Sequence, residues 1–566
     1  MSKKKIRIAH MSGPTATIQN SPALVTSNKA RLKYGLPPRI GEHGEAARFD
    51  ALRAQRLAAP AIVYVEQFSA HPLERDAADL YGAPDGYIGA DGAFSRERRS
   101  AEDKPVYEVE LRPQDGLYPL PYMARQIDGR AWEEECADPG APTEKARQGF
   151  YPDGSRVFEE IDRLAVGPDG LAGTISSLAE ITFHRVLPPG GFTRGRAENE
   201  RDDAGEGDIP PERRGRDFFP YKPRHLSATP PRPALAKATN DVQRILSSGD
   251  YDGAIWTQGS PNIEDTTYWF NLLIDTTLPI ACNAAQRPNG QTSADGAENI
   301  LDSLRYIESR VWADAEGRNR LGTLLIQDQQ FFAAREAAKA DARPGGYVAT
   351  GGHGGILGQI SHVGRVSLTY LPAYKHTHLS DVRVTILPRA VEAVTKGASG
   401  LERIEIAIKG ADGSLLEDAI PAVSILKDGG YCTLEWGDDP DFEADLIAAI
   451  DHKLALGKLA GFVVEGTVPA GNMTSPARQK LVTRAVFSGL PVVRVGRGSH
   501  EGFADPHPVF IGGSNLTATK ARFLLMASLM KLGSLPVAAD PVKPTQEEAR
   551  KTAEAVAAYQ AIFDSH

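Results

Sequence analysis

The stretch TQGSPNIEDT, residues 257–266, gathers hydroxyl and carboxylate side chains directly after the apolar, strand-like run DYDGAIW. Such groups at the end of a buried strand are typical of a ligand site, because parallel sheets bind ligands at the carboxyl ends of their strands. Pro261 stands inside this stretch, and proline carries neither a carboxylate nor a backbone N–H. The stretch is therefore a candidate site with one position that can supply no charge.

A second group of hydroxyls lies in SGPTATIQNSP, residues 12–22, a loop that follows the strand-like run KKIRIAHM. His376 and His378 could bind a metal, but two histidines without further ligands are more often incidental. The glycines of GGHGG, residues 351–355, lack the spacing of a phosphate-binding or dinucleotide-binding loop. They indicate a tight turn, and we expect no metal site.

Several elements must position these groups. PAIVYVEQF (60–68) predicts a buried strand, and the pattern between about residues 70 and 220 is irregular. This region contains the strand-like LAEITFHRVL (178–187). It also contains residues 194–216, which are almost all charged, Gly or Pro and predict a mobile loop. We treat about 70–220 as an insert.

Beyond residue 230, helix-like and strand-like segments alternate, which predicts an α/β fold with a parallel sheet. A Pro- and His-containing linker is expected at 371–381, and a second alternating series runs from VRVTILP (382–388) to residue 532. The segments of the first series are ALAKATNDVQRIL (helix), YDGAIWTQG (strand), IEDTTYWFNLLI (helix), LPIACNAA (strand), SADGAENILDSLRYI (helix) and GTLLIQD (strand).

The tail at 544–563 opens with a TxxE capping box at Thr545 and Glu548, so it predicts a helix. Val556, Tyr559 and Phe563 fall on one face of that helix. We expect this face to pack on the body of the protein or on a partner.

The length and composition of the chain argue against several classes of protein. The 566 residues exceed what one core can serve, so two or more domains are expected. The net charge of −9 argues against a nucleic-acid binder. Three dispersed cysteines without a CxxC argue against a disulfide framework or a structural zinc. Without an apolar signal segment or a membrane-length apolar run, a cytoplasmic protein is expected, away from membranes.

Four blocks of sequence occur in an order that resembles the bacterial asparaginase/glutaminase family. They are ATIQN (16–20), TQGSPNIEDT with LPIACNAAQRP and SADGAENILDSL (257–304), AAREAAKAD (333–341), and GTVPAGN…LPVVRVGRG…GGSNLTATKARFLLMASL (466–529). The resemblance covers roughly residues 1–35 and 225–535. It implies an α/β fold of two domains, a larger N-terminal parallel-sheet domain at 1–371 and a smaller C-terminal domain at 382–535, with a C-terminal helix at 544–566.

The resemblance implies hydrolysis of an amide by a threonine nucleophile on the first loop. A hydroxyl attacks only after a base removes its proton, and a lysine can be that base when its pKa is lowered. Thr17 matches the family's nucleophile best, because Thr17-Ile18 matches the T-I of the TGGTI loop. Thr15 and Ser12 are rivals, because SGPTA replaces the paired glycines. Tyr34 matches a tyrosine that assists the nucleophile, or is a packing residue.

The second block departs from the family's THGTDT pattern in an informative way. Gly259 keeps the turn glycine, and Ser260 replaces a threonine but keeps its hydroxyl. Pro261 replaces the aspartate that contacts the substrate's amino group in the family, and Asn262 follows where a threonine is usual. Lys339 matches the relay lysine, so a Ser260–Lys339 pair would keep a chemically possible relay.

Weaker matches concern binding. Ser227 falls near the family's substrate-carboxylate loop, and Asn472 matches an asparagine of the second domain that reaches a neighbouring site. Glu501 and Asp505 lie where the family brings an acidic residue across a subunit interface, although a solvated surface role is the expectation for both.

The leading hypothesis is an amidohydrolase acting on a small amide, cyclic imide or lactam other than free asparagine, without a cofactor. The alternative is a non-catalytic asparaginase-like protein, a ligand binder or a partner-dependent subunit, with the insert as its interaction module. Ordinary asparaginase activity ranks third because of Pro261. The resemblance also implies a homodimer or homotetramer.

Overall fold

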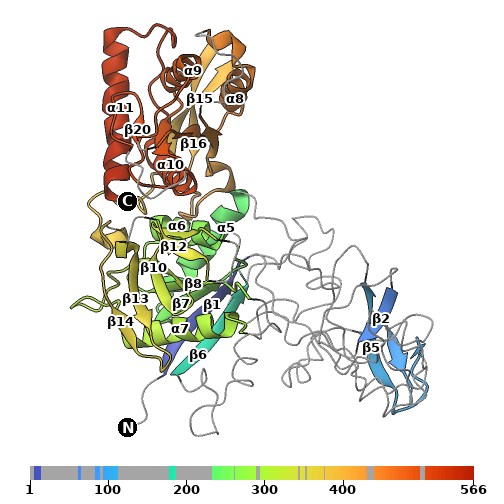
Figure 1. Cartoon of the computed structure of the whole chain (residues 1–566). Coiled ribbons are helices and arrows are strands. Elements are labelled where there is room, and N and C mark those ends of the chain that lie inside the picture. The colour runs from blue at the N-terminus through green and yellow to red at the C-terminus, as the bar shows by residue number, and fades with distance from the viewer. Residues whose placement is uncertain are drawn as a thin grey trace, which may run out of the picture. The chain divides into compact units, whose positions relative to one another are not determined.

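Figure 1 shows the computed structural model of the chain, which forms two compact units. The first unit comprises residues 1–229, 256–260 and 284–301, and the second comprises 230–255, 261–283 and 302–566. The domain boundaries given by the sequence stay a prediction. The structure describes residues 5–13, 61–65, 83–89, 94–111, 178–185, 232–260, 262–287, 293–341, 345–350, 353–374, 376–429, 439–468, 470–497 and 504–566.

The principal sheet has eight strands and confirms the predicted α/β class. Its strands pair in parallel where helices separate them along the chain, as in β8 with β9, and in antiparallel hairpins from β9 onward. The order across the sheet is β14 (Val366–Leu368), β13 (Ile356–Ile360), β10 (Gln330–Ala333), β9 (Thr323–Gln327), β8 (Ile280–Asn283), β7 (Gly253–Thr257), β1 (Ile6–Ser12) and β6 (Ala179–Arg185).

Strand β6 differs from the sequence interpretation, which assigned LAEITFHRVL to the insert. It pairs in parallel with β1 over seven residues, from Ile6 opposite Ala179 to Ser12 opposite Arg185. Because β6 is an edge strand of the principal sheet, it does not belong to a separate interaction module. The described remainder of the insert contributes three strands to a four-stranded sheet, and the fourth, β2, is the strand predicted at 60–68. The order is β2 (Ala61–Val65), β5 (Lys104–Leu111), β3 (Gly86–Ile88) and β4 (Phe94–Ser95).

The predicted helices of the first series are present as α5 (Arg232–Leu246), α6 (Ile263–Leu273) and α7 (Gly296–Ser309). Helix α6 packs against β8, β9 and α10 (Ala518–Leu532). Tyr268, Trp269 and Phe270 are consecutive and all fully buried, so the middle of α6 lies in the interior.

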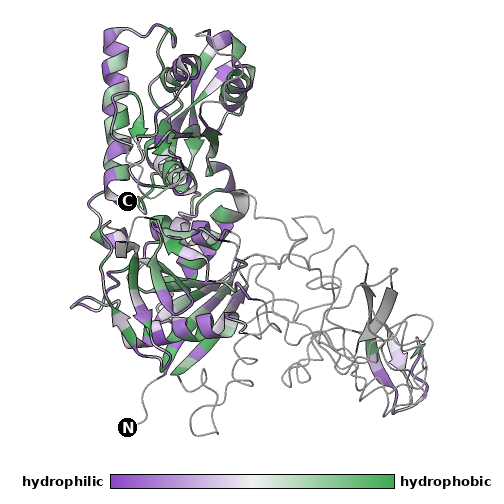
Figure 2. Cartoon of the chain, viewed as in Figure 1, coloured by the Kyte–Doolittle hydropathy of each residue, from purple (hydrophilic) through white to green (hydrophobic). Residues whose placement is uncertain are grey.

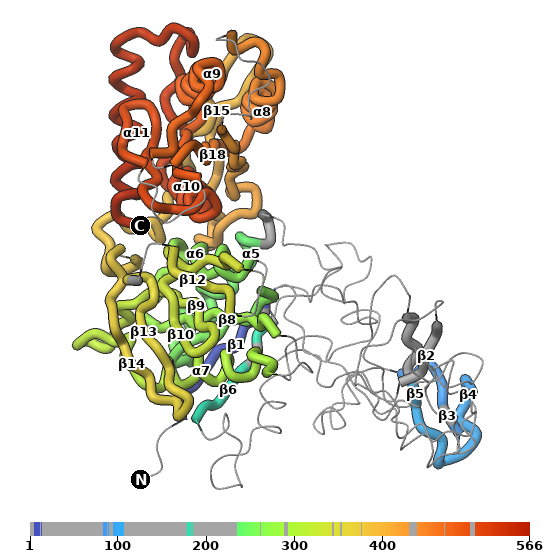
Figure 3. The backbone as a smooth tube through the Cα atoms, viewed as in Figure 1, coloured from blue at the N-terminus to red at the C-terminus, as the bar shows by residue number. Residues whose placement is uncertain are grey.

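The second series forms a four-stranded parallel sheet in the order β17 (Ala422–Lys427), β18 (Ala460–Gly466), β19 (Val492–Gly496) and β20 (Ile511–Gly512). Helices α8 (Ala444–Ala455), α9 (Pro476–Phe487) and α10 pack on it (Figure 3). VRVTILP forms turns rather than a strand, because its one fully buried apolar residue, Val384, has no strand partner. The hairpin β15 (Ala390–Gly397) and β16 (Gly400–Ala407) follows instead.

The predicted C-terminal helix is confirmed as α11 (Gln546–Ser565), including its capping box. Thr545 Oγ1 accepts from the Glu548 backbone N–H, and Glu548 accepts from the Thr545 N–H at 2.8 Å. Val556, Tyr559 and Phe563 are at most 3% exposed, and α11 contacts α9, α10 and β20. Figure 2 shows hydrophilic residues along the remainder of this helix.

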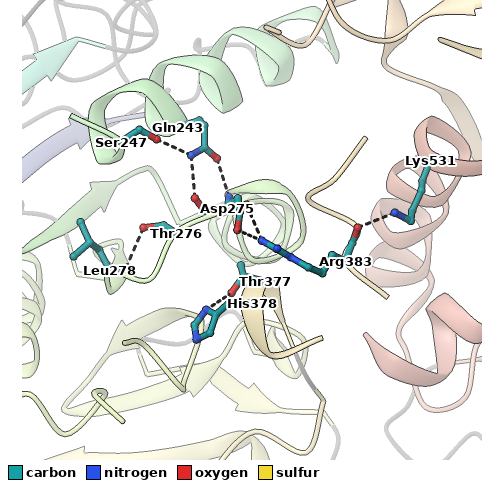
Figure 4. A network of polar contacts seen from close by, with 9 residues as sticks. All are labelled: Gln243, Ser247, Asp275, Thr276, Leu278, Thr377, His378, Arg383 and Lys531. Carbon is teal, nitrogen blue, oxygen red and sulfur yellow. Dashed lines mark hydrogen bonds and ion pairs between the residues drawn. The ribbon is translucent and has the colours of Figure 1, made fainter. Parts of the chain in front are cut away.

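A polar network holds the end of the linker and the segment directly after it (Figure 4). Asp275, in the loop after α6, accepts two bonds from Arg383 at 2.7 and 2.8 Å. Gln243 of α5 holds the backbone N–H and C=O of Asp275, and Lys531 of α10 donates to the Arg383 carbonyl at 2.8 Å. The linker is thus bonded to the elements on both sides of it in sequence. Among the described helices, none has the length and apolar composition of a membrane span.

Replacing Phe563 by Ala should destabilise the packing of α11 by about 3–5 kcal/mol, the usual cost of removing a buried phenyl ring. Urea unfolding followed by circular dichroism measures this change. The exposed Lys551 of the same helix provides the control, and Lys551→Ala should stay within about 0.5 kcal/mol. Equal effects of the two variants would contradict the described docking of α11.

Candidate active site at the carboxyl edge of the principal sheet

The candidate site lies where β1 and β7 end. Gly13, directly after β1, donates its backbone N–H to the carbonyl of Thr257, the last residue of β7, at 2.7 Å. At the other end of β7, the Ala254 N–H bonds to Pro279, which precedes β8, at 3.0 Å. The three strands therefore run in the same direction. The loop after β1, which carries the predicted nucleophile, begins beside the TQGS stretch.

Close contact between these two loops explains a glycine of the first motif. A Cβ atom on Gly13 would lie 2.6 Å from Cζ2 of Trp256, closer than side-chain carbons approach. The indole N–H of Trp256 donates to Gln258 Oε1 at 2.9 Å and fixes that side chain. Gly13 is thus required by the neighbouring ring, and the ring in turn orients the residue before Gly259.

A buried histidine that the sequence analysis did not single out anchors this edge. His10 Nε2 lies 2.9 Å from Oγ1 of Thr257, and both residues are buried. Burial, and then the nearby His184 of β6, lower the pKa of His10 to about 3. A neutral imidazole with such a low pKa is a weak base, so His10 orients the Thr257 hydroxyl rather than activating it. A histidine in an otherwise apolar strand is the sequence signal that could have revealed it.

Besides the segments that end β1 and β7, the candidate site includes the loop between β8 and α7. This loop contains the AAQRP and SADG motifs. The buried Asp295 accepts from the backbone N–H groups of Gln286 and Arg287 at 2.9–3.1 Å. Asn299 of α7 donates to the Ala284 carbonyl at 2.8 Å. The aspartate of SADG therefore shapes the loop from within, and its carboxylate is committed to backbone donors.

The predicted residues of the TQGSPN stretch are partly described. Gly259 and Ser260 are half-buried at the end of the β7 segment, whereas Pro261 lies outside the described residues. Asn262 precedes α6 with a φ of 69°, in the left-handed region. Asparagine tolerates this conformation and β-branched residues do not, which accounts for Asn at a position where the family has a threonine.

Lys339 lies on the short strand β11 (Ala337–Lys339), where it pairs opposite Tyr347 of β12 (Tyr347–Ala349). It is half-buried rather than fully enclosed. Asn472 and Asp505 are exposed, as expected for Asp505, and the Asn472 carbonyl accepts from Thr467. The predicted residues that lie outside the described part of the chain are Thr17, Thr15, Tyr34, Ser227 and Glu501, together with the side chain of Ser12.

The most enclosed lysine near these motifs is a different one, Lys520 of α10, which is 1% exposed. Burial lowers its pKa to about 8, although Asp265 opposes the shift. Burial likewise raises the pKa of Asp265 to about 6, opposed by Lys520, and raises the pKa of Glu336. The sequence analysis missed Lys520, because a lysine in a helix is usually solvated.

The described residues contain no group of three or more His, Cys, Asp or Glu side chains arranged to hold a metal. The rings of His376 and His378 are 6.4 Å apart and nearly perpendicular. Burial, with a smaller effect of His378, lowers the pKa of His376 to about 4. His376 is buried where the linker packs, whereas His378 is half-buried.

The low pKa of His10 predicts acid sensitivity of the candidate site. Between pH 6.5 and about 3, the unfolded chain binds a proton on His10 that the folded chain does not, so stability falls as the pH falls. Relative to His10→Gln, the free energy of unfolding of the wild type should fall by about 1.4 kcal/mol per pH unit within this window. Urea titrations at pH 4–7 test this. The exposed His362→Gln should keep the wild-type slope, and an equal slope in His10→Gln would refute the assignment.

Comparison with known proteins finds similarity to asparaginases over part of the chain. The family model for the asparaginase N-terminal region matches residues 227–360. The chain is 28% identical over 107 residues to L-asparaginase 2 of Bacillus subtilis, covering 19% of this chain and 27% of the relative. It is also 28% identical over 106 residues to the glutaminase-asparaginase of Acinetobacter glutaminasificans, covering 19% and 29%. The chain thus spans less than a third of the length of these relatives.

Among solved structures, the probable cytoplasmic L-asparaginase of Campylobacter jejuni aligns with a TM-score of 0.41 and 20% identity. The alignment covers 59% of this chain and 80% of that one. The segment matched by the family model contains β7, α6, β8, α7 and β9 to β13, and thus includes the TQGSPN, SADG and AAREAAKAD motifs. Residues 227–360 are therefore similar to the N-terminal region of asparaginases.

Proposed function

We propose that the protein is an amidohydrolase that cleaves the carbon–nitrogen bond of a small amide, cyclic imide or lactam lacking an α-amino group. Thr17 is the nucleophile in this proposal, and Ser260 with Lys339 forms the relay that accepts its proton. The proposal combines the similarity of residues 227–360 to asparaginases with the local departures of this sequence. The reaction needs water and no cofactor.

The observation that carries the proposal is the bond from the Gly13 N–H to the Thr257 carbonyl at 2.7 Å. It supports a site in which the hydroxyl-bearing loop after β1 starts beside the TQGS stretch. Thr17 follows Gly13 by four residues, and Ser260 follows Thr257 by three. The start of the loop and the end of β7 thus share a sheet edge, where α/β folds bind ligands.

In the proposed reaction, the Thr17 oxygen attacks the substrate carbonyl carbon while its proton passes through Ser260 to Lys339. Backbone N–H groups of the glycine turns stabilise the oxyanion that forms. The carbon–nitrogen bond then breaks, and the relay returns the proton to the leaving nitrogen. Water finally hydrolyses the ester on Thr17, which releases the acid and regenerates the hydroxyl.

Pro261 is the basis for the proposed substrate class. A proline cannot pair with a substrate ammonium group, because it has no charge and no backbone donor. A site that is built for an amino-acid substrate without this partner would leave a buried cation unpaired, which is costly. The retained hydroxyls and lysine support catalysis on substrates without that ammonium group. A homodimer or homotetramer is part of the proposal through the family resemblance.

Release of ammonia or amine from a panel of amides, cyclic imides and lactams, with asparagine and glutamine included, tests the activity. Thr17→Ala and Lys339→Ala should each lower kcat by about 10²-fold or more, since general acid–base groups contribute on this scale. Thr15→Ala separates the rival nucleophile. Lys396→Ala, which removes an exposed lysine of β15, is the matched control and should leave kcat unchanged.

Loss of activity in Thr15→Ala but not in Thr17→Ala would move the nucleophile by two residues. Turnover of asparagine by the wild type would contradict the interpretation of Pro261. If no compound is turned over, the partner-dependent, non-catalytic alternative replaces the proposal.

Pro261→Asp tests the substrate class directly, because it returns the carboxylate that the family has at this place in the motif. For analogues of an active compound that carry an added α-amino group, KM should fall about tenfold, equivalent to about 1.4 kcal/mol of binding. Pro261→Asn has nearly the same size without the charge and should give no such gain. Equal KM values in the two variants would show that charge at residue 261 does not select the substrate.

A further inference from the structure

Lys520 is a buried cation whose partners all come from other elements. It lies in the first turn of α10, within the GGSNLTATK motif of the second series, where Thr517 caps the helix. Its Nζ donates to the carbonyl of Glu264 at 2.5 Å and to the carbonyl of Ala334 at 2.8 Å. It also lies 5.2 Å from the centre of the Tyr268 ring. One ammonium group therefore joins α10 to two segments that are 70 residues apart in the sequence.

Both acceptors lie in motifs that the proposed reaction uses. Glu264 is in the first turn of α6, four residues after Ser260 in the sequence. Ala334 is in AAREAAKAD, five residues before Lys339. Lys520 thus holds the backbone just beyond one relay residue and just before the other.

A second bond between the same motifs runs parallel to the first. Arg335 donates from Nη1 to Asn515 Oδ1 at 2.8 Å, and Asn515 belongs to GGSNLTATK. The guanidinium also stacks 3.6 Å from the centre of the Tyr374 ring. The AAREAAKAD turn is therefore fixed at two successive residues by one motif of the second series.

The surrounding charges show why Lys520 is hard to replace. Asp265 is buried and Glu336 is half-buried, and both carboxylates act on Lys520, so the ammonium neutralises acidic groups from both segments. Burying a cation costs several kcal/mol unless partners compensate. A neutral side chain at residue 520 would remove the donor from two carbonyls and a compensating charge from both carboxylates.

We propose that Lys520 is a positioning residue, which sets the relative placement of the first turn of α6 and the AAREAAKAD turn and thereby the placement of Lys339. The inference rests on the proposed function for its catalytic consequence. Lys520 does not touch the reacting atoms in this proposal. It acts through the backbone of the two segments, because displacements of about 1 Å in a site can cost about 10²-fold in rate.

The helix offers a matched control in Lys531, which also donates to two carbonyls, those of Arg383 and Ile386 at 2.8 and 3.1 Å. Amide hydrogen exchange of Lys520→Met should quicken about tenfold or more in peptides covering residues 262–268 and 334–339. Peptides from β18 should keep wild-type exchange. Lys531→Met should quicken exchange at 383–386 and leave both site segments unchanged.

Uniform acceleration in Lys520→Met, or unchanged exchange in the two segments, would overturn the inference. If Lys520→Met does not fold, Asn515→Ala decides, because it removes a single bond and leaves the ammonium in place. In Asn515→Ala, faster exchange at 334–339 with unchanged exchange at 262–268 supports the inference, because the remaining Lys520 bond still holds the first turn of α6. Unchanged exchange at both segments in Asn515→Ala would overturn the inference.

Kinetics on a substrate from the panel provide the functional readout. Lys520→Met should lower kcat about tenfold or more with KM within about twofold, whereas Lys531→Met should keep the wild-type kcat. An equal loss of kcat in Lys520→Met and Lys531→Met would show that Lys520 only stabilises the fold and is not a positioning residue. If the wild type turns over nothing, the proposed function fails, and the exchange pattern still decides whether Lys520 fixes the two segments. Turnover with unchanged exchange rejects the inference alone.

Discussion

An ammonium group in a protein interior must be surrounded by acceptors, and this requirement organises the second compact unit. Lys520 satisfies it with carbonyls from α6 and from the turn after β10, and with the charges of Asp265 and Glu336. Neither segment can shift alone without leaving a buried donor unpaired. Helix α6 is fixed further along its length, where Tyr268 donates its hydroxyl to the His566 carbonyl at 2.9 Å. A polar contact at the start of the helix and apolar burial beyond it therefore fix the same element.

The edge of the principal sheet is held differently, by hydrogen bonds between nearby polar groups rather than by a buried ammonium group. His10 pairs with Thr257, Trp256 pairs with Gln258, and Asp295 bonds to backbone N–H groups of its own loop. These bonds hold the described strand ends and the loop after β8. Ser260 and Lys339, which the proposal assigns to the relay, are half-buried. A rigid edge that carries reactive groups on its loops is the usual arrangement of an α/β active site.

The sequence predicted the elements whose signals are local. Apolar runs of strand length located β7, β8 and β9, and helical periodicity with a capping box located α11. Strand β6 was assigned to the wrong part of the chain, because its pairing with β1 depends on residues far away in sequence. The sequence did not predict the burial of Lys520 and His10 for a related reason. Whether a polar side chain is buried depends on its neighbours in space. Asn262 differs from these two residues, because it was conspicuous in the sequence as a departure from the motif. Its left-handed backbone conformation, which asparagine tolerates, explains it.

The position of β1 within the sheet has a consequence for how the chain is made. Its neighbours are β6 and β7, and the first residue of β6 is Ala179. At roughly 5–20 residues per second, a ribosome needs on the order of ten seconds or more to synthesise the chain between β1 and its first partner. During that time Ile8, Ala9 and Met11, which are fully buried in the finished sheet, lack both of their described neighbouring strands. The order of synthesis therefore separates the making of this apolar strand from the making of the strands that flank it.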